Sequence, residues 1–134
     1  MKEYCYQKTS HDELLGLIRW AQNELCLRDW AVVLHTGPLC PRRLMPEIEV
    51  KLGGMTDPMH DEMYAEIWVP LDRFGADNYN PVEICCHEML HIFCNNNHIK
   101  DEDDERITRI LTPTLYVAYC KAFGKKQAKV KDVS

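Results

Sequence analysis

The segment NPVEICCHEMLH, which begins at Asn80, limits the structures open to this chain more than any other stretch. Asn80 suits the residue that caps a helix, Pro81 suits the first helical position, and Glu83 completes a capping box. These signals predict a helix over residues 81–95, which a run of three asparagines brings to an end. The spacing of side chains along this helix therefore decides which of them can act together.

Within the predicted helix, His87, Glu88 and His91 form the pattern H-E-x-x-H. Residues four apart lie on one helical face, so the two imidazoles can bind one tetrahedral cation. Glu88 projects to the side of the histidines, from where its carboxylate can reach a metal-bound water without binding the metal. Zinc lowers the pKa of such a water to about 7, and Glu88 would take its proton as the water attacks a carbonyl. The motif predicts a Zn²⁺ site with the chemistry of a hydrolase.

The alternative interpretation is a pair of buried histidines that are satisfied by hydrogen bonds alone. The pentapeptide does not decide between the two, because so short a pattern also arises by chance. Its surroundings favour the metal: Ile84, Met89 and Leu90 predict a largely buried helix, in which unpaired polar groups are costly.

The third ligand is not fixed by spacing. A histidine six residues after His91 would suit one known pattern, but Asn97 stands there and His98 comes one residue late. A ligand about twenty residues further on, another known spacing, would fall on Leu111, which cannot bind a metal. The remaining candidates each have an atom that can bind a metal, and they lie near the end of this helix or after it. They are Cys94, His98 and the acids of Asp101–Glu105.

Elsewhere the chain alternates helix and strand signals that predict an α+β domain. Ser10 and Glu13 form a capping box for a first helix, which should end near residues 27–29. Residues 55–62 are expected to form a loop. Runs rich in β-formers, or alternating between charged and apolar residues, predict three strands: Trp30–Thr36, Glu47–Leu52 and Met63–Val69.

A last helix is predicted to begin within Asp101–Glu105, where five acids suit its positive end. Pro113 should kink this helix or split it in two. The lysine-rich residues 125–134 are expected to form a frayed, flexible basic tail of a domain that spans residues 1–134. The sheet should hold three strands, or four, and pack against the two late helices.

Composition and charge disfavour several classes of protein. A net charge of −5 and a pI of about 5.6 do not favour general binding to nucleic acid. No apolar run approaches the roughly 20 residues that a membrane span needs. The N-terminal residues lack the apolar stretch of a signal peptide, so we expect a cytoplasmic protein whose seven cysteines are reduced thiols.

Four features resemble the small bacterial and phage zincin-like metallopeptidases of the gluzincin type, relatives in layout of the SprT-like and ImmA/IrrE proteins. The first is a leading helix that ends in Leu27-x-x-Trp30, and the second is a strand of the type AEIWV at Ala65–Val69. The third is an H-E-x-x-H helix directly after Asn-Pro, and the fourth is a later helix that begins with a glutamate. The resemblance covers most of the chain loosely, and only H-E-x-x-H is highly specific.

The resemblance implies that the later glutamate is the third zinc ligand, with apolar residues two, five and six positions after it. Glu105 fits this pattern. Helical periodicity favours its neighbour instead, because Asp104 precedes Ile107 by three residues and Leu111 by seven, which places it nearest the apolar face. We prefer Glu105 as the ligand, with Asp104 and His98 as alternatives.

Three further parts of such a site are not fixed by the residues alone. In the resembling family an acid four residues after the third ligand often orients a histidine, but that place is Arg109 here. The resemblance also favours Met63–Val69 as the edge strand along the cleft, to which a peptide could add. Candidates to stabilise an oxyanion share a side chain that can donate a hydrogen bond: His60, Tyr64, Tyr116 and Tyr119.

The sequence thus predicts a zinc-dependent metallopeptidase in which His87, His91 and Glu105 hold Zn²⁺ and Glu88 is the general base. Its substrate would be a peptide or protein, and a protein partner could complete a cleft that this short chain leaves open. One alternative is a non-catalytic zincin-fold regulatory or assembly module with a structural zinc, which a fourth ligand from Cys94 or His98 would support. Another is a SprT-like protease acting on DNA-bound proteins, which the acidic charge disfavours.

Overall fold

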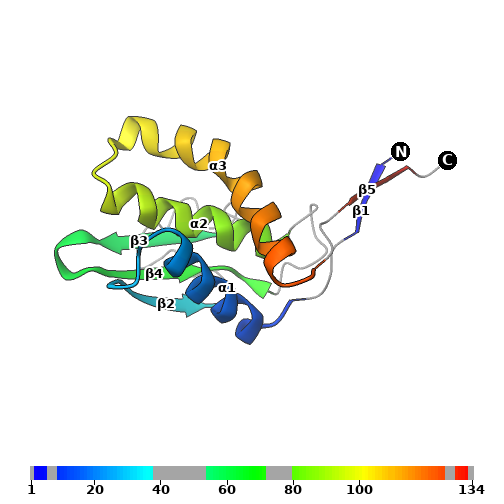
Figure 1. Cartoon of the computed structure of the whole chain (residues 1–134), viewed down its shortest axis with the longest axis horizontal. Coiled ribbons are helices and arrows are strands. Elements are labelled where there is room, and N and C mark those ends of the chain that lie inside the picture. The colour runs from blue at the N-terminus through cyan, green and yellow to red at the C-terminus, as the bar shows by residue number, and fades with distance from the viewer. Residues whose placement is uncertain (1, 6–8, 38–53, 72–79, 126–128, 133–134) are drawn as a thin grey trace.

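The computed structural model describes residues 2–5, 9–37, 54–71, 80–125 and 129–132. They form an α+β fold of three helices, a three-stranded mixed sheet and a separate two-stranded ribbon (Figure 1). In chain order the elements are β1 (Lys2–Cys5), α1 (His11–Glu24), β2 (Ala31–His35), β3 (Met55–Met59), the 3-10 turn η3 (His60–Glu62), β4 (Tyr64–Trp68), α2 (Pro81–Asn96), α3 (Asp101–Ala122) and β5 (Lys129–Asp132).

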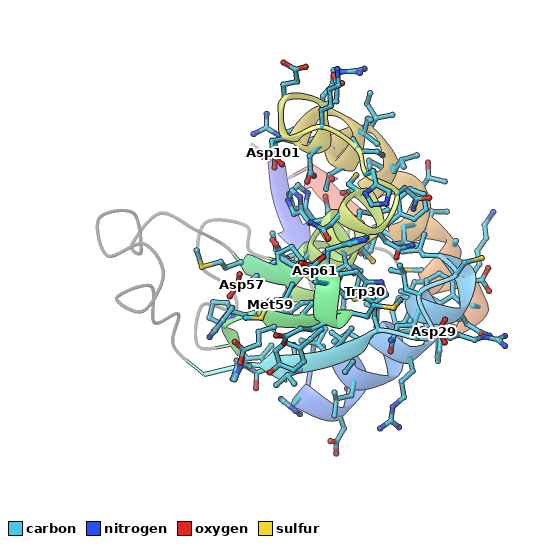
Figure 2. All side chains as sticks on the ribbon, turned by 90° about the vertical axis from the view of Figure 1, so that its left-hand side faces the viewer. Asp29, Trp30, Asp57, Met59, Asp61 and Asp101 are labelled. Carbon is cyan, nitrogen blue, oxygen red and sulfur yellow. The ribbon has the colours of Figure 1, made fainter. Side chains whose placement is uncertain are left out.

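The three-stranded sheet has the order β2-β4-β3, with β4 in the centre. β2 runs parallel to β4, with Ala31 opposite Tyr64, and β3 runs antiparallel, with Met59 opposite the same tyrosine. η3 joins β3 to β4 through Met63, which adopts the left-handed conformation with φ of 48°. Figure 2 views the molecule from this end, with Met59 and Asp61 near the viewer.

α2 is the central helix of the fold. It contacts α1, β3 and β4 on one side and α3 on the other, so it lies between the sheet and α3 (Figure 1). Asn80 caps it as predicted, because the asparagine side chain accepts hydrogen bonds from the backbone N–H groups of Val82 and Glu83. The buried apolar side chains of α1, α2 and the sheet share one core, which includes Leu14, Leu17, Ile18, Leu34, Ala65, Ile67, Met89, Leu90 and Ile92.

The strand predictions are confirmed at β2 and β4, but two expectations about the sheet are wrong. Residues 55–62 are not a loop: Met55–Met59 form β3, in which Pro58 is tolerated because β3 is an edge strand among the described residues. β4 is not the edge strand, because both of its sides are hydrogen-bonded to neighbouring strands. The predicted strand Glu47–Leu52 lies outside the described residues.

α3 runs without interruption through Pro113, so of the two expected outcomes, a kink or a split, the split is wrong. Buried residues on both sides of the proline, Thr108 and Leu115 among them, anchor both halves of the helix in the fold. The tail is not frayed throughout, because Lys129–Asp132 pairs with Lys2–Cys5 as an antiparallel ribbon. Among the described residues, no helix combines the length and the apolar character needed to cross a membrane.

Candidate metal centre

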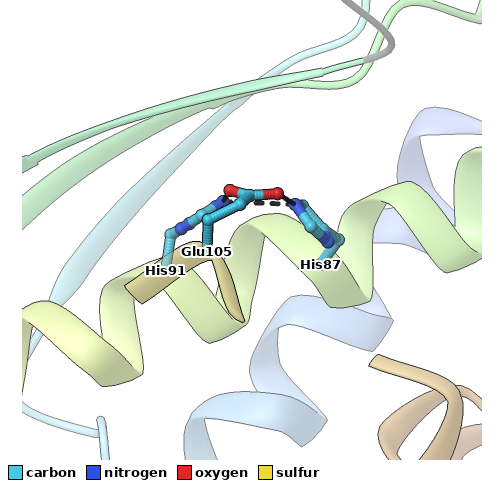
Figure 3. A group of neighbouring side chains, drawn as sticks. All are labelled: His87, His91 and Glu105. Atoms are coloured by element: carbon cyan, nitrogen blue, oxygen red, sulfur yellow. Dashed lines mark hydrogen bonds and ion pairs between the residues drawn. The ribbon is translucent and has the colours of Figure 1, made fainter. Parts of the chain in front are cut away.

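His87 and His91 lie one turn apart on α2 and point their rings toward each other. Their Nε2 atoms are 3.2 Å apart. The Glu105 carboxylate, from the second turn of α3, bridges them: Oε1 lies 3.3 Å from Nε2 of His87, and Oε2 lies 3.3 Å from Nε2 of His91 (Figure 3). The three side chains form a group that could hold a metal ion.

The turn between α2 and α3 explains why Glu105 reaches the two rings. α2 ends at Asn96, and His98 takes the left-handed conformation with φ of 55°. The backbone N–H of Ile99 then donates to the carbonyl of Cys94, which closes the end of α2. The chain turns back at this point, so the start of α3 passes over the last turns of α2.

The donor distances fit a metal ion. Zinc holds a histidine nitrogen at 2.0–2.1 Å, so two nitrogens on one tetrahedral zinc stand about 3.3 Å apart. The observed separation of the two Nε2 atoms is 3.2 Å. Each ring makes its other polar contact through Nδ1, so it is Nε2 that faces the carboxylate. Burial also lowers the pKa of His87, which favours the neutral imidazole that metals bind.

Both imidazoles are held from behind by α3. His91 contacts the carboxylate of Asp104 through Nδ1 at 2.7 Å, and His87 contacts the hydroxyl of Thr112 through Nδ1 at 3.3 Å. Metal-binding histidines usually have such partners on their second nitrogen. Sequence reasoning had left these partners open.

Glu88, the residue that follows His87 on α2, is 5% exposed. The hydroxyl of Thr56, on β3, donates to Oε1 of Glu88 at 2.5 Å. Burial raises the pKa of Glu88 to about 7. The hydrogen bond from Thr56 and the charge of His91 oppose this rise, whereas the charge of Glu105 adds to it. The carboxyl is therefore within electrostatic reach of the centre, and it can both take and give a proton near neutral pH.

Gly54 makes room for this carboxyl. A Cβ atom added at Gly54 would lie 2.6 Å from Cγ2 of Ile84 and 3.1 Å from Oε2 of Glu88. Only a residue without a side chain fits there unless its neighbours move. The segment that leads into β3 thus shapes the wall of the site next to Glu88.

The residues weighed as the third ligand have different places. Glu105 joins the group that could hold a metal ion, whereas Asp104 contacts Nδ1 of His91, so the two acids meet different atoms of the site. The thiol of Cys94 is buried against the hydroxyl of Thr108 at 3.7 Å. His98 packs against His60 of the β3–β4 turn, with 4.7 Å between ring centroids.

Two of the candidate oxyanion donors are engaged elsewhere. Tyr119 is 2% exposed and packs against Trp20 in the core. The hydroxyl of Tyr116 accepts a hydrogen bond from the side-chain amide of Asn80 at 3.2 Å. Arg109, which stands where the resembling family often has an acid, contacts Oε1 of Glu105 through Nε at 3.1 Å.

Sequence reasoning missed the residues that support the site from other elements. Gly54 and Thr56 belong to a stretch whose proline disguised a strand, and no local signal marks them. Thr108 and Thr112 carried a usable signal, because they follow Asp104 at four-residue spacing on a helix predicted to pack beside the histidines.

Comparisons with protein-family models, with curated proteins and with solved structures found no match to this chain. The fold and the site therefore define it as an α+β protein with a candidate metal centre of two histidines and one glutamate. The interpretation of that centre depends on its chemistry alone.

Proposed function

We propose that this chain is a small zincin-like, zinc-dependent metallopeptidase. The observation that carries the proposal is the convergence of His87, His91 and Glu105: the two Nε2 atoms lie 3.2 Å apart, and each lies 3.3 Å from one carboxylate oxygen of Glu105. These atoms are acceptors of protons or metals when the imidazoles are neutral. A cation between them removes the repulsion of their lone pairs.

In this proposal His87, His91 and Glu105 hold Zn²⁺. When bound, zinc acts as a Lewis acid that activates water and polarises the carbonyl of the substrate. Nitrogen and carboxylate donors are those of catalytic zinc sites, in which three protein ligands leave a fourth position open. The side chain of Glu105 is 49% exposed, so the centre can be reached from the surface.

Glu88 is the general base. It accepts a proton from the attacking water and then delivers this proton to the amine nitrogen as the peptide bond breaks. A pKa of about 7 suits both transfers, because the group is then neither too weak a base nor too weak an acid near neutral pH. Thr56 fixes one carboxylate oxygen and thereby sets the direction of the other.

The main rival is a non-catalytic zincin-fold regulatory or assembly module with a structural zinc. Such sites are closed by four protein ligands. Within the described residues the group has three ligands, and Cys94 and His98 have other partners. An open site with a buried, raised-pKa carboxyl beside it supports the enzyme instead.

The substrate class in this proposal is a peptide or protein, and a protein partner could complete the cleft. The acidic balance of the chain, −5 overall, supports neither nucleic acid nor an anionic membrane surface as a partner. We also propose a cytoplasmic location.

The test measures zinc content and cleavage of a casein-type substrate for the wild type and Glu88→Gln. We expect about one zinc per chain in both proteins, and a loss of cleavage of roughly 100-fold or more in the variant, since general base catalysis contributes about 10²–10⁴-fold. Glu102→Gln, which removes an exposed carboxylate of α3, serves as the control and should cleave normally. Zinc-loaded wild type that is inert on every peptide would favour the non-catalytic module.

A further inference from the structure

α3 carries a polar stripe of Asp104, Thr108 and Thr112, which are four residues apart and therefore on one face of the helix. Thr108 is 0% exposed and Thr112 is 5% exposed. Polar groups this deeply buried need partners. Their partners lie within the stripe itself, on the rings of His87 and His91 and, for Thr108, on the thiol of Cys94.

The direction of each hydrogen bond in the stripe follows from the donors available. The hydroxyl of Thr112 donates its one proton to the carbonyl oxygen of Thr108 at 2.6 Å. It can then only accept from Nδ1 of His87, 3.3 Å away. The imidazole of His87 therefore carries a proton on Nδ1, which in the neutral ring leaves a lone pair on Nε2.

The same argument applies to the second imidazole. An ionised carboxylate is only an acceptor, so Nδ1 of His91 donates to Asp104 across 2.7 Å. The hydroxyl of Thr108 donates to the same oxygen of Asp104 at 3.1 Å and holds that carboxylate in place. The stripe thus contacts both imidazoles on the side away from the centre.

We propose that Asp104, Thr108 and Thr112 are positioning residues that set both imidazoles in the Nδ1–H tautomer before any metal binds. Both Nε2 lone pairs are then aimed at the centre in the metal-free protein. Zinc binding then needs no ring flip and no change of tautomer. The affinity for zinc is therefore higher than it would be if either imidazole had to rearrange first. This inference rests on the proposed zinc centre, and it adds to that proposal how the affinity of the centre is set.

A purely structural role is the alternative. A threonine that donates to the carbonyl four residues earlier is common within helices, and an aspartate near a helix N-terminus stabilises the helix dipole. Neither role depends on the histidines. The two explanations therefore differ in what happens to the imidazole protons when the stripe is altered.

The decisive experiment is ¹⁵N NMR of the imidazoles in the full chain, freed of metal by a chelator and held at about pH 8, above the ordinary histidine pKa of about 6.5. The signals of the two rings among the six histidines are assigned from His87→Gln and His91→Gln. We expect both rings of the wild type to carry the proton on Nδ1. A substantial Nε2–H population in either ring of the wild type would overturn the proposal, whatever the variants do.

Thr112→Val keeps the shape of the side chain and removes the hydroxyl. We expect the His87 ring to become a mixture of tautomers and zinc affinity to fall by about 10–100-fold, as is usual when such a partner is lost. Thr112→Ser, which restores a hydroxyl, should recover both properties. Thr114→Val, on the exposed side of the same helix, is the matched control and should change neither.

Asp104→Asn tests the other ring, and Asp103→Asn removes the same charge one residue earlier, where the partner is Arg106. We expect weaker zinc binding only for Asp104→Asn. Equal effects in the two variants, or an unchanged tautomer in Thr112→Val, would show that the stripe is structural only. Failure of the wild type to bind zinc would instead remove the metallopeptidase proposal, while the tautomers of the metal-free protein would still be measured.

Discussion

α2 and α3 build the candidate centre in different ways. α2 supplies three side chains of the proposed site, His87, Glu88 and His91, within five consecutive residues. α3 supplies Glu105 and the polar stripe, which together extend over more than two helical turns. The side chains on α2 form a compact sequence motif. Those on α3 are spread along the helix and form a site only when α3 packs against α2.

The difference separates the residues that could react from the residues that arrange them. A metal-binding pair on one helix needs no other element to bring it together, because helical geometry alone sets its spacing. The orientation of the rings and the third ligand need a second element at a defined distance. In this protein the left-handed turn at His98 returns the chain across α2, and this places α3 beside the two histidines.

The largest expected effect comes from removing one ligand from either helix. Zinc at about 1,000 times its dissociation constant should stabilise the folded wild type by about 4 kcal/mol, because it binds the folded state. We expect His91→Ala on α2 and Glu105→Ala on α3 both to lose this zinc-dependent gain. Urea unfolding with and without zinc measures it.

A matched control for that comparison is Glu102→Ala, which removes an exposed carboxylate from the first turn of α3. It should keep the zinc-dependent gain. Retention of the full gain in Glu105→Ala would mean that α3 contributes no ligand and that the centre belongs to α2 alone.

The next effect concerns Glu88 and the pH dependence of stability without metal. Its pKa rises from 4.5 to about 7 on folding, so between these values the folded state binds more protons than the unfolded state. Stability should then fall as pH rises through this window, by up to about 3 kcal/mol. In Glu88→Gln this fall should be absent.

Urea unfolding in the presence of a chelator, at about pH 5 and about pH 8, measures the difference. We expect Glu88→Gln to gain on the wild type as pH rises and to be the more stable protein at the higher pH. A constant difference between the two proteins would show that Glu88 titrates at its ordinary pKa, and it would weaken the assignment of this residue as the base. The burial of the Glu88 carboxyl would then not lower the free energy of unfolding as pH rises.

The same contrast explains what the sequence could predict. The α+β class, the bounds of α2 and the H-E-x-x-H pair follow from local signals such as the cap at Asn80, and the fold confirms the first two. The choice between Asp104 and Glu105 could not be made from periodicity, because the more buried acid contacts the far nitrogen of His91 and the more exposed one faces the centre. Periodicity predicted that Asp104 lies nearer the apolar face of α3. It could not predict that the partner of Asp104 is Nδ1 of His91.

β3 is the part that local signals hid. Pro58 and the absence of alternating residues disguise a strand that pairing with β4 stabilises, and its position depends on contacts with α2. Thr56 reaches Glu88 only because the edge strand lies against that helix. Such a residue is found from tertiary structure and not from a motif.

A smaller effect is expected where β3 meets α2. Gly54→Ala forces a methyl group to within 2.6 Å of Ile84 and 3.1 Å of the Glu88 carboxylate, so something must shift. We expect a loss of about 1–3 kcal/mol in the free energy of unfolding and a lower rate of cleavage. Gly16→Ala, in α1 with open space around the added atom, is the control and should stabilise by about 0.5–1 kcal/mol. Equal effects would mean that Gly54 does not shape the site.

The smallest effect tests whether the orientation of the centre comes from the stripe alone. Arg109 contacts Glu105 at 3.1 Å, but its side chain is 74% exposed, and exposed ion pairs contribute at most about 1 kcal/mol. We expect Arg109→Gln to change the free energy of unfolding by less than about 0.5 kcal/mol and zinc affinity by less than about threefold, as measured by urea unfolding and by competition with a chelator. A tenfold loss of affinity would show that Arg109 holds the Glu105 carboxylate over the two rings. The face of α3 that orients the centre would then extend from its buried stripe to its exposed side.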